Sequence, residues 1–308
     1  MTDDDADLET ELGRLGLCTG YERNRLVWHL ARRGEPIVAH LQRIRRNGPG
    51  ALRAAALEIL VNIVGEAGLH PADLAAAERL VRIKAPVEPF VNLSLCWDTW
   101  MCVRGGDQQA ILTGLGLTPV RPATFALAAS VVADRRDDPD NLVFVTPELN
   151  GWTVVAGRWC DPSDDDRAEE VRHLAERLSA EHGAAHAFFI TEYSDYSAWL
   201  IAEHGRTIRR YSEDDAALAL GRPLPVERRH LDALGISASP EELHGNDEME
   251  EELSEFTYAC TARTVAAEMS IDIVGGVHRN DAVVRGTGLL ARPPGASTTT
   301  ISPGPYEI

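Results

Sequence analysis

Apolar residues recur at helical spacing in the first part of the chain. Six of them, between residues 52 and 63, stand three or four positions apart and would line one side of a helix. A second helix is predicted to begin at Pro71, because proline suits the first helical turn. Two more are predicted over 23–33 and 36–46. The inward positions of the first two helices are Leu52, Ala55, Ala56, Ile59, Leu60 and Ile63, then Leu74, Ala77, Leu80 and Val81.

Residues 16–86 are therefore predicted to form an all-helical region. Two short helical hairpins in series resemble HEAT-like repeats, and this resemblance implies a scaffold that binds other proteins. The residues before them, 1–15, contain six acids and only a few apolar side chains. We expect these residues to be a disordered acidic leader.

The pattern changes after the proline-containing segment 85–89, which is predicted to be a linker. Beyond it, short apolar and β-branched segments alternate with turn signals. The clearest of these signals is Asn150-Gly151, which predicts a β-hairpin. The predicted elements of this stretch are a strand over 95–103, a helix over 107–115, and hairpin strands over 142–146 and 152–156.

A further helix is predicted between Ser163 and Gly183. Ser163 and Asp166 have the spacing of a capping box, and glycine is a common helix end. Three strands follow with short links, over 186–191, 198–203 and 207–211. The order β-β-α-β-β-β predicts an α+β fold, with a mainly antiparallel sheet and helices on one face.

The α+β domain is predicted to span 87–291. Its last elements are expected to be helices over 225–234 and 255–269 and a strand over 283–291. The tail, 292–308, is rich in proline, glycine, serine and threonine. We expect this tail to be disordered.

The formal net charge of −18 argues against a nucleic-acid or membrane-surface binder, since both of those partners are polyanionic. It favours a basic protein partner and leaves the oligomeric state open. No apolar run reaches the roughly 18 to 20 residues that span a bilayer. The acidic start lacks the basic region of a secretory signal, so we expect a cytoplasmic protein. The 29 arginines and single lysine, Lys84, are typical of a GC-rich bacterial genome.

No motif predicts a cofactor, a metal ion or a catalytic centre. The sequence GTGLLA at 286–291 has dinucleotide-site spacing, but two prolines follow where a helix must begin. His182 and His186 have the spacing of a zinc-peptidase pair, but Gly183 occupies the position of the general base. The five cysteines include no CxxC pair and are expected to be reduced thiols.

Two segments are strongly charged. Residues 21–53 contain eight arginines against two glutamates, and residues 246–255 contain six acids. The arginines either pair with the protein's own acids or form a docking face for an acidic partner or nucleic acid. The acidic run is either a solvated segment or an attraction for a cationic surface.

The segment 191–199 places two tyrosines around an acid at a tight connection between predicted strands. Tyrosine offers a large contact area at low entropy cost and is enriched at protein interfaces. The next strand brings an arginine, a tyrosine and a glutamate to the same neighbourhood. Alternatively, the aromatic pair supports the core at the end of a hairpin. The predicted partner-binding residues are Tyr193, Asp195, Tyr196, Arg209, Tyr211 and Glu213.

The stretch 142–229 resembles cytoplasmic immunity proteins that accompany polymorphic toxins in GC-rich bacteria. The resemblance lies in LVFVTPELNGWTVVAGRW, an acid-rich helix start, AFFITEYSDYSAWLIAEHGRTIRRYSED and LGRPLPVERR. These segments contain no catalytic residues to carry over. The resemblance implies a non-enzymatic protein that binds a toxin.

Three functions are therefore open. The first is an immunity-type inhibitor that covers the active site of a basic toxin or effector. The second is an adaptor or scaffold subunit that docks through its helical N-terminal region. The third is an enzyme whose site no motif reveals, with Glu192, Asp195 and His204 as acid–base candidates at strand ends.

Overall fold

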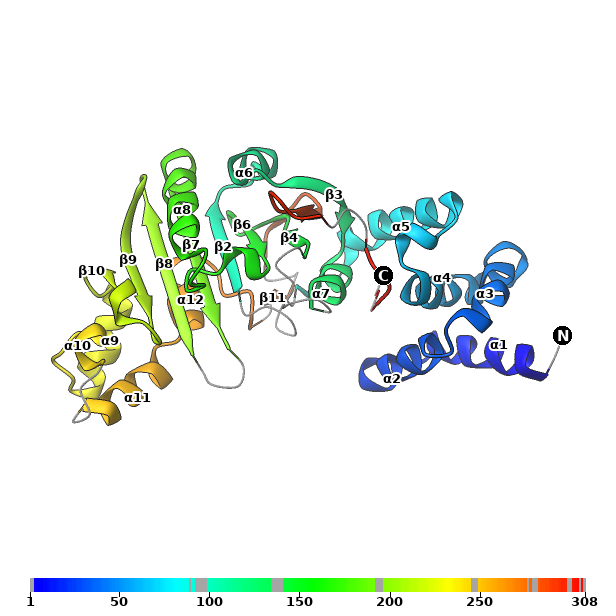
Figure 1. The fold of residues 1–308 in the computed structure, drawn as a ribbon, viewed down its shortest axis with the longest axis horizontal. Helices are drawn as coiled ribbons and strands as arrows, with labels where there is room; N and C mark the ends of the chain where they lie inside the picture. Colours follow the sequence, from blue (N-terminus) through cyan, green and yellow to red (C-terminus); the bar gives the residue numbers. More distant parts are fainter. Residues whose placement is uncertain are drawn as a thin grey trace.

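The molecule consists of two parts that lie side by side along its long axis (Figure 1). The N-terminal helices form the helical part, and a large sheet with its own helices forms the sheet part. The C-terminal residues lie between the two parts. This computed structural model describes residues 3–88, 90–91, 99–133, 141–191, 196–244, 249–275, 277–278, 282–297, 301–304 and 306.

The helical part confirms the four predicted helices and adds one before them. Its core includes Leu30, Leu41, Ile59 and Leu60, all of which are buried. Its helices are α1 (Asp3–Leu15), α2 (Gly20–Ala31), α3 (Glu35–Asn47), α4 (Gly50–Val64) and α5 (Pro71–Lys84), with short 3₁₀ turns η1 (Glu66–Gly68) and η2 (Ala85–Val87).

The predicted disordered leader is wrong, because most of that segment forms α1. Leu8, Leu12 and Leu15 recur at helical spacing and are buried against α4. Of the described acids of this helix, Asp7 is exposed, while Glu11 is partly buried and pairs with Arg33. Three leucines on one side of a helix are therefore enough to dock a segment that its acidic composition marks as disordered.

The α+β fold with a large antiparallel sheet is confirmed. The main sheet follows the order β10-β9-β8-β7-β2-β6-β4-β13-β3 with β5 and β12 at its side, and β1 pairs with β11 apart from it. Every strand pair in the described part is antiparallel. The strands are β1 (Phe90–Val91), β2 (Thr99–Arg104), β3 (Thr118–Ala123), β4 (Val143–Val145), β5 (Glu148–Leu149), β6 (Trp152–Ala156), β7 (Ala184–Ile190), β8 (Ser197–Glu203), β9 (Arg206–Ser212), β10 (Leu220–Gly221), β11 (Val277–His278), β12 (Val284–Arg285) and β13 (Gly288–Arg292).

The predicted hairpin and the three later strands are confirmed. Asn150 and Gly151 have positive φ angles of 52° and 86°, as a tight hairpin turn requires. The turn joins β5 to β6, and β4 also pairs with β6. Strand β2 lies between β6 and β7, so the segment at 99–104 becomes a central strand.

Helices cover both faces of the main sheet rather than the single face that we predicted. On one face, Met101 and Val155 pack with the residues of α6 and α8. On the other, Trp100 and Phe188 pack with α7, α9, α11 and α12. The reason is visible in β2, β6 and β8, which are buried at almost every position. These helices are α6 (Gln108–Leu115), α7 (Phe125–Ala133), α8 (Ala168–His182), α9 (Pro225–Leu234), α10 (Pro240–Leu243), α11 (Glu250–Ala259) and α12 (Ala262–Met269), with 3₁₀ turns η3 (Arg158–Cys160) and η4 (Ala216–Leu218).

Two helix boundaries differ from the predictions. Helix α8 begins at Ala168, so the predicted Ser163–Asp166 capping box does not form, and Asp161 instead accepts hydrogen bonds from the backbone and hydroxyl of Ser163. The predicted helix at 255–269 is two helices. Thr261 separates them and caps α12 by accepting a hydrogen bond from the backbone of Thr264.

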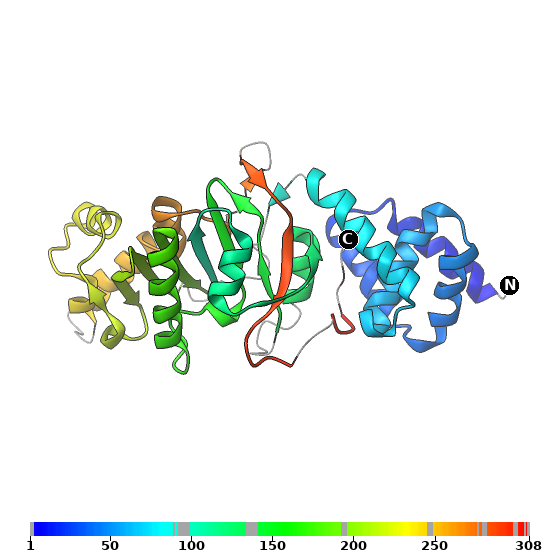
Figure 2. The same cartoon turned by 90° about the horizontal axis from the view of Figure 1, so that it is seen from above.

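The C-terminal tail is packed where it is described, so the prediction of a disordered tail is wrong there. Ile301 and Tyr306 are buried. The backbone N–H of Glu66 donates to the carbonyl of Ile301 at 2.9 Å, and that of Gly304 donates to the carbonyl of Asn62 at 3.1 Å. Figure 2 shows this red segment running from the sheet to the helical part. The tail therefore ties the two parts together.

None of the helices in the described part of the chain is long and apolar enough to cross a membrane. Cys18, Cys102, Cys160 and Cys260 are free thiols. Cys96 lies outside the described residues.

Candidate functional site

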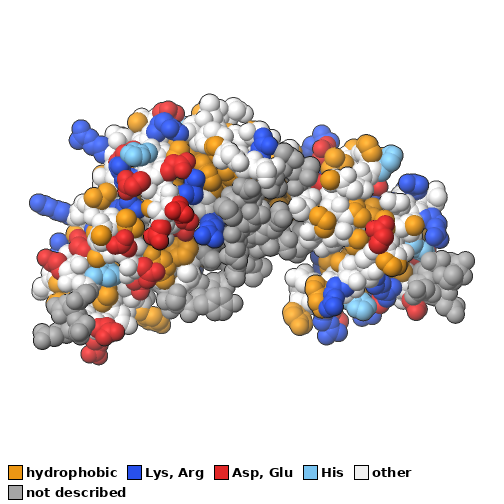
Figure 3. Space-filling view, viewed as in Figure 1, with side chains coloured by type: hydrophobic (Ala, Val, Ile, Leu, Met, Phe, Trp, Pro, Cys, Tyr) orange, Lys and Arg blue, Asp and Glu red, His pale blue; other side chains and the backbone are white. Residues whose placement is uncertain are grey.

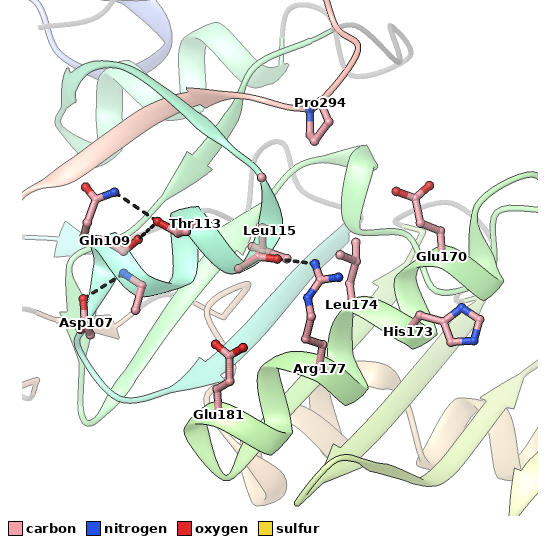
Figure 4. Close-up of a pocket in the computed structure, with 13 residues that line it drawn as sticks. Asp107, Gln109, Thr113, Leu115, Glu170, His173, Leu174, Arg177, Glu181 and Pro294 are labelled. Carbon is pink, nitrogen blue, oxygen red and sulfur yellow. Dashed lines mark hydrogen bonds between the residues drawn. The ribbon is translucent and has the colours of Figure 1, made fainter.

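A groove of about 920 Å³ runs between α6 and α8 (Figure 4). Asp107, Gln109 and Thr113 border it from the α6 side, and a row of polar side chains borders it along α8. Its volume lies in the range of roughly 300 to 1,000 Å³ that is typical of ligand sites. The α8 residues that line it are Glu170, His173, Leu174, Arg177 and Glu181.

The floor of the groove depends on a close approach of the two helices. A Cβ atom at Gly114 would lie 2.9 Å from a methyl group of Leu178, so a larger residue there would force the Leu178 side chain to shift. Arg177 reaches across the groove and donates a hydrogen bond from Nη2 to the carbonyl of Gly114 (Figure 4). Arg177 is the one arginine of the lining, and it keeps its positive charge when it makes this bond.

The exposed charge of the groove is mainly acidic. Asp107 accepts a hydrogen bond from the backbone of Ala110 at 2.9 Å and so caps α6. Glu170 forms a surface ion pair with Arg167 at 2.9 Å. Glu181 has no ion pair in the described part of the chain, and Asp165 and Asp166 lie exposed just before α8. Figure 3 shows red acidic side chains spread over this part of the molecule, among basic ones.

The spacing of these carboxylates suits binding rather than acid–base chemistry. Glu170 and Glu181 are separated by about three turns of α8, which corresponds to about 16 Å along the helix axis. The paired catalytic carboxylates of glycoside hydrolases stand about 5 to 9.5 Å apart, and those of aspartic proteases are closer still. The two glutamates can instead each attract a different cationic side chain of a partner.

No metal centre is present among the residues that the structure describes, since no three His, Cys, Asp or Glu side chains group together there. His186 is buried in β7 and His182 lies at the end of α8, so the two do not face a common site. The GTGLLA segment enters strand β13 and opens no helix. His204 lies exposed in the turn after β8, while Glu192 and Asp195 lie outside the described residues.

The structure brings two of the predicted partner-binding residues together near the start of β8. The hydroxyl of Tyr196 lies 2.8 Å from the hydroxyl of Ser212, and its ring packs edge-on against Phe189. Glu213 accepts a hydrogen bond from the backbone of Ser197 at 3.0 Å. Two further predicted residues of this segment, Tyr193 and Asp195, lie outside the described residues.

Arg209 and Tyr211, also predicted to bind a partner, are buried instead. The ring of Tyr211 stacks on Trp199 with 4.4 Å between centroids. Arg209 donates hydrogen bonds to both carboxylate oxygens of Glu227 and to Glu241. The exposed fraction of Arg209 is 0% and that of Tyr211 is 2%. Helices α9 and α10 cover this face of β9 and supply the two carboxylates, so neither residue belongs to an exposed surface.

Six of the eight arginines of residues 21–53 fall into two groups. Three of them form ion pairs within the protein: Arg23 with Glu58, Arg33 with Glu11 and Arg45 with Asp73. Three others, namely Arg25, Arg32 and Arg46, are exposed and form no ion pair within the described ranges.

Arg25 on α2, and Arg32 directly after its end, lie beside two exposed aromatic rings, Tyr21 and Trp28. Arg32 lies over the Trp28 ring, 4.5 Å from its centroid. This aromatic and basic face was not among the predicted partner-binding residues. The signal was available, because the four residues recur at helical spacing.

Comparison with protein families, with curated proteins and with solved structures gives no match. The fold and the groove define this chain as an α+β protein with a helical N-terminal part and an acidic groove between two helices.

Proposed function

We propose that this protein is a non-enzymatic protein-binding module, an immunity-type inhibitor that binds a basic toxin or effector through the groove between α6 and α8. The observation that supports this function best is the excess of exposed carboxylates at the groove: Asp107, Glu170 and Glu181 line it against the single cation Arg177, and Asp165 and Asp166 lie exposed just before α8. A basic segment of the partner would lie along α8 and present lysine or arginine side chains to these acids.

The net charge of −18 adds long-range attraction for such a partner. Electrostatic steering raises association rates and falls steeply with ionic strength. Nuclease toxins that act on nucleic acid need basic surfaces, and an acidic inhibitor that covers such a surface competes directly with the substrate. Tyr196 and Glu213 belong to the contact region predicted from the sequence, and we propose it as a second contact beside the groove.

The proposal is tested by measuring the binding of the purified chain to a basic protein encoded beside its gene. The double variant Glu170→Lys/Glu181→Lys reverses two charges in the groove, and its affinity should fall about tenfold or more. The matched control Glu35→Lys/Asp232→Lys reverses two exposed charges elsewhere and should weaken binding less. Equal weakening by the two variants would show that only net charge matters, and would refute the groove as the binding site.

An adaptor or scaffold subunit is the second candidate, and the exposed aromatic face of α2 favours it. Its test is assembly with a partner complex after Tyr21→Ala/Trp28→Ala substitution. If this variant no longer assembles while Glu170→Lys/Glu181→Lys still does, the helical part is the docking element. An enzyme is the remaining alternative, and turnover by the purified chain would establish it.

A further inference from the structure

Helix α2 carries an exposed aromatic and basic surface. Tyr21, Arg25, Trp28 and Arg32, here called the α2 stripe, follow the spacing i, i+4, i+7 and i+11 and so share one side of the helix. Tyr21 is 82% exposed and Trp28 is 60% exposed, and Leu17, just before the helix, is 85% exposed. Aromatic residues and arginine are enriched at the centres of protein interfaces.

The surroundings of the α2 stripe are hollowed and carry charges of both signs, with an excess of exposed arginine. A groove of about 360 Å³ between α1 and α2 is lined in part by Arg14, Arg25 and Trp28, and also by Glu22 and by Glu11, which pairs with Arg33. Arg14, Arg25 and Arg32 are exposed and form no ion pair in the described part of the protein. Figure 3 shows hydrophobic and basic side chains together along the lower edge of the helical part, where Figure 1 places α2. The surface therefore fits an acidic partner that also offers an aromatic ring.

The same chain presents a surface of that kind on α11. Glu251, Glu255 and Tyr258, here called the α11 stripe, follow the spacing i, i+4 and i+7 and are exposed. Tyr258 is 80% exposed. Neither glutamate forms an ion pair among the described residues. Both stripes thus combine exposed aromatic rings with unpaired charges, and the charges are of opposite sign.

We propose that the α2 stripe of one molecule binds the α11 stripe of a second copy of this chain. The two helices lie in different parts of the elongated molecule, α2 in the helical part and α11 at the far end of the sheet part (Figure 1). One molecule leaves both of its own stripes free, so the contact forms between copies. Two different surfaces meet, so the contact either closes a two-fold dimer, in which each α2 stripe meets the α11 stripe of the other copy, or links molecules head to tail into rings or open chains.

The attraction between the oppositely charged stripes outweighs the repulsion between two copies that each carry a net negative charge. At physiological ionic strength the screening length is about 8 Å, so most of the acidic surface of the two molecules lies too far apart to repel strongly. Arginine and glutamate side chains that touch across the helices remain inside that length. Two helix faces of this size bury less than the roughly 1,200 to 2,000 Å² of a stable complex, so the association is expected to be weak and concentration-dependent.

Sedimentation velocity of the full chain, from low to high micromolar concentration, tests the proposal. The weight-average sedimentation coefficient of the wild type should rise with concentration and fall back at about 1 M salt, where the screening length is about 3 Å. Two variants each remove one stripe: Tyr21→Ala/Trp28→Ala on α2, and Glu251→Gln/Glu255→Gln on α11. Each variant alone should remain monomeric. The control Glu35→Gln/Asp232→Asn removes two exposed charges outside both stripes and should associate like the wild type.

An equimolar mixture of the two stripe variants gives the sharpest result. Each variant retains the stripe that the other lacks, so the mixture should form dimers and nothing larger. A wild type that stays monomeric throughout, a stripe variant that associates like the wild type, or a mixture without dimers would each overturn the proposal. Neither variant touches the groove between α6 and α8, and the measurement requires no toxin. Its outcome is therefore independent of the proposed inhibitory function.

Discussion

The hydroxyl of Tyr306 donates a hydrogen bond to Oε1 of Glu66 at 2.8 Å, between residues 240 positions apart in the chain. Arg121 of β3 completes the group, since its Nη1 donates to the Tyr306 hydroxyl at 2.9 Å and pairs with Glu66. Burial raises the pKa of Tyr306 to about 12. The hydroxyl therefore stays protonated at neutral pH and can donate the hydrogen bond to Glu66. This buried group joins the helical part, the sheet and the tail at one point.

Tyr306→Phe should lower the free energy of unfolding by about 1 to 3 kcal/mol, because buried Glu66 and Arg121 each lose a hydrogen-bond partner. Urea denaturation measures the change. Tyr258→Phe makes the same chemical change at an exposed site and should leave the denaturation midpoint unchanged. A Tyr306→Phe variant as stable as the wild type would show that the tail is not held through this hydroxyl.

At Gly65 the described part of the tail lies against the backbone of the helical part. A Cβ atom there would lie 2.9 Å from the backbone nitrogen of Pro303 and 3.0 Å from the carbonyl oxygen of Ile301. Gly65→Ala should therefore displace the tail and increase its cleavage in limited proteolysis. Gly34→Ala is the matched control, because its φ of 64° is close to the 65° of Gly65 but no atom lies within 4 Å of its Cβ position. Equal proteolysis of the two variants would contradict the expected clash.

Arg209 and Glu227 form a fully buried ion pair, with an Nη2–Oε1 distance of 2.7 Å. Burial alone would lower the pKa of Arg209, but hydrogen bonds to Glu227 raise it above its ordinary value. Arg209→Met should destabilise the protein by about 3 to 5 kcal/mol, because it leaves a buried carboxylate without its cation. Adding Glu227→Gln should recover part of this loss in thermal unfolding. Arg229→Met breaks an exposed ion pair with Glu268 and should have little effect on stability. If Arg229→Met and Arg209→Met lose similar amounts of stability, burial is not what makes the Arg209 pair important.

The sequence predicted the elements whose signals are local. Helix α9 occupies Pro225–Leu234, because proline suits its first turn and Gly235 its end. The strands β7, β8 and β9 were recognised from β-branched and aromatic residues between turn signals. In each case the physical cause of the element lies within about ten residues of the element itself, so the pattern alone is sufficient.

The features that were missed depend on partners distant in sequence. Arg209 looked like an exposed residue of a strand, and only Glu227 and Glu241 on helices beyond the strand allow it to be buried. The tail was predicted to be disordered because its composition is polar and the partners of Tyr306, Glu66 and Arg121, lie far from it in the sequence. The groove formed by α6 and α8 likewise joins segments that no local pattern connects. Of the predicted site, Tyr196 and Glu213 share a neighbourhood, and partner binding by them stays a prediction.

Buried His186 should make the protein less stable in mild acid. Burial, together with the charge of Arg104, lowers the pKa of His186 from 6.5 to about 4, and neither ring nitrogen has a hydrogen-bond partner in the described part of the chain. The unfolded chain therefore binds a proton at higher pH than the folded protein does. The stability that neutral His186 contributes is complete above its unfolded pKa and is lost as the pH falls from about 6.5 toward 4.

Between about pH 7 and about pH 5 this single group should cost the wild type about 2 kcal/mol of unfolding free energy. His186→Leu removes the titrating ring from a site beside Trp152, whose ring centroid lies 5.2 Å away, and should flatten the pH dependence by that amount. Urea denaturation of both proteins at the two pH values measures the difference. His173→Leu removes a histidine that is exposed on α8 and should keep the wild-type pH dependence. If His186→Leu loses as much stability as the wild type over this interval, another buried group must cause the acid sensitivity.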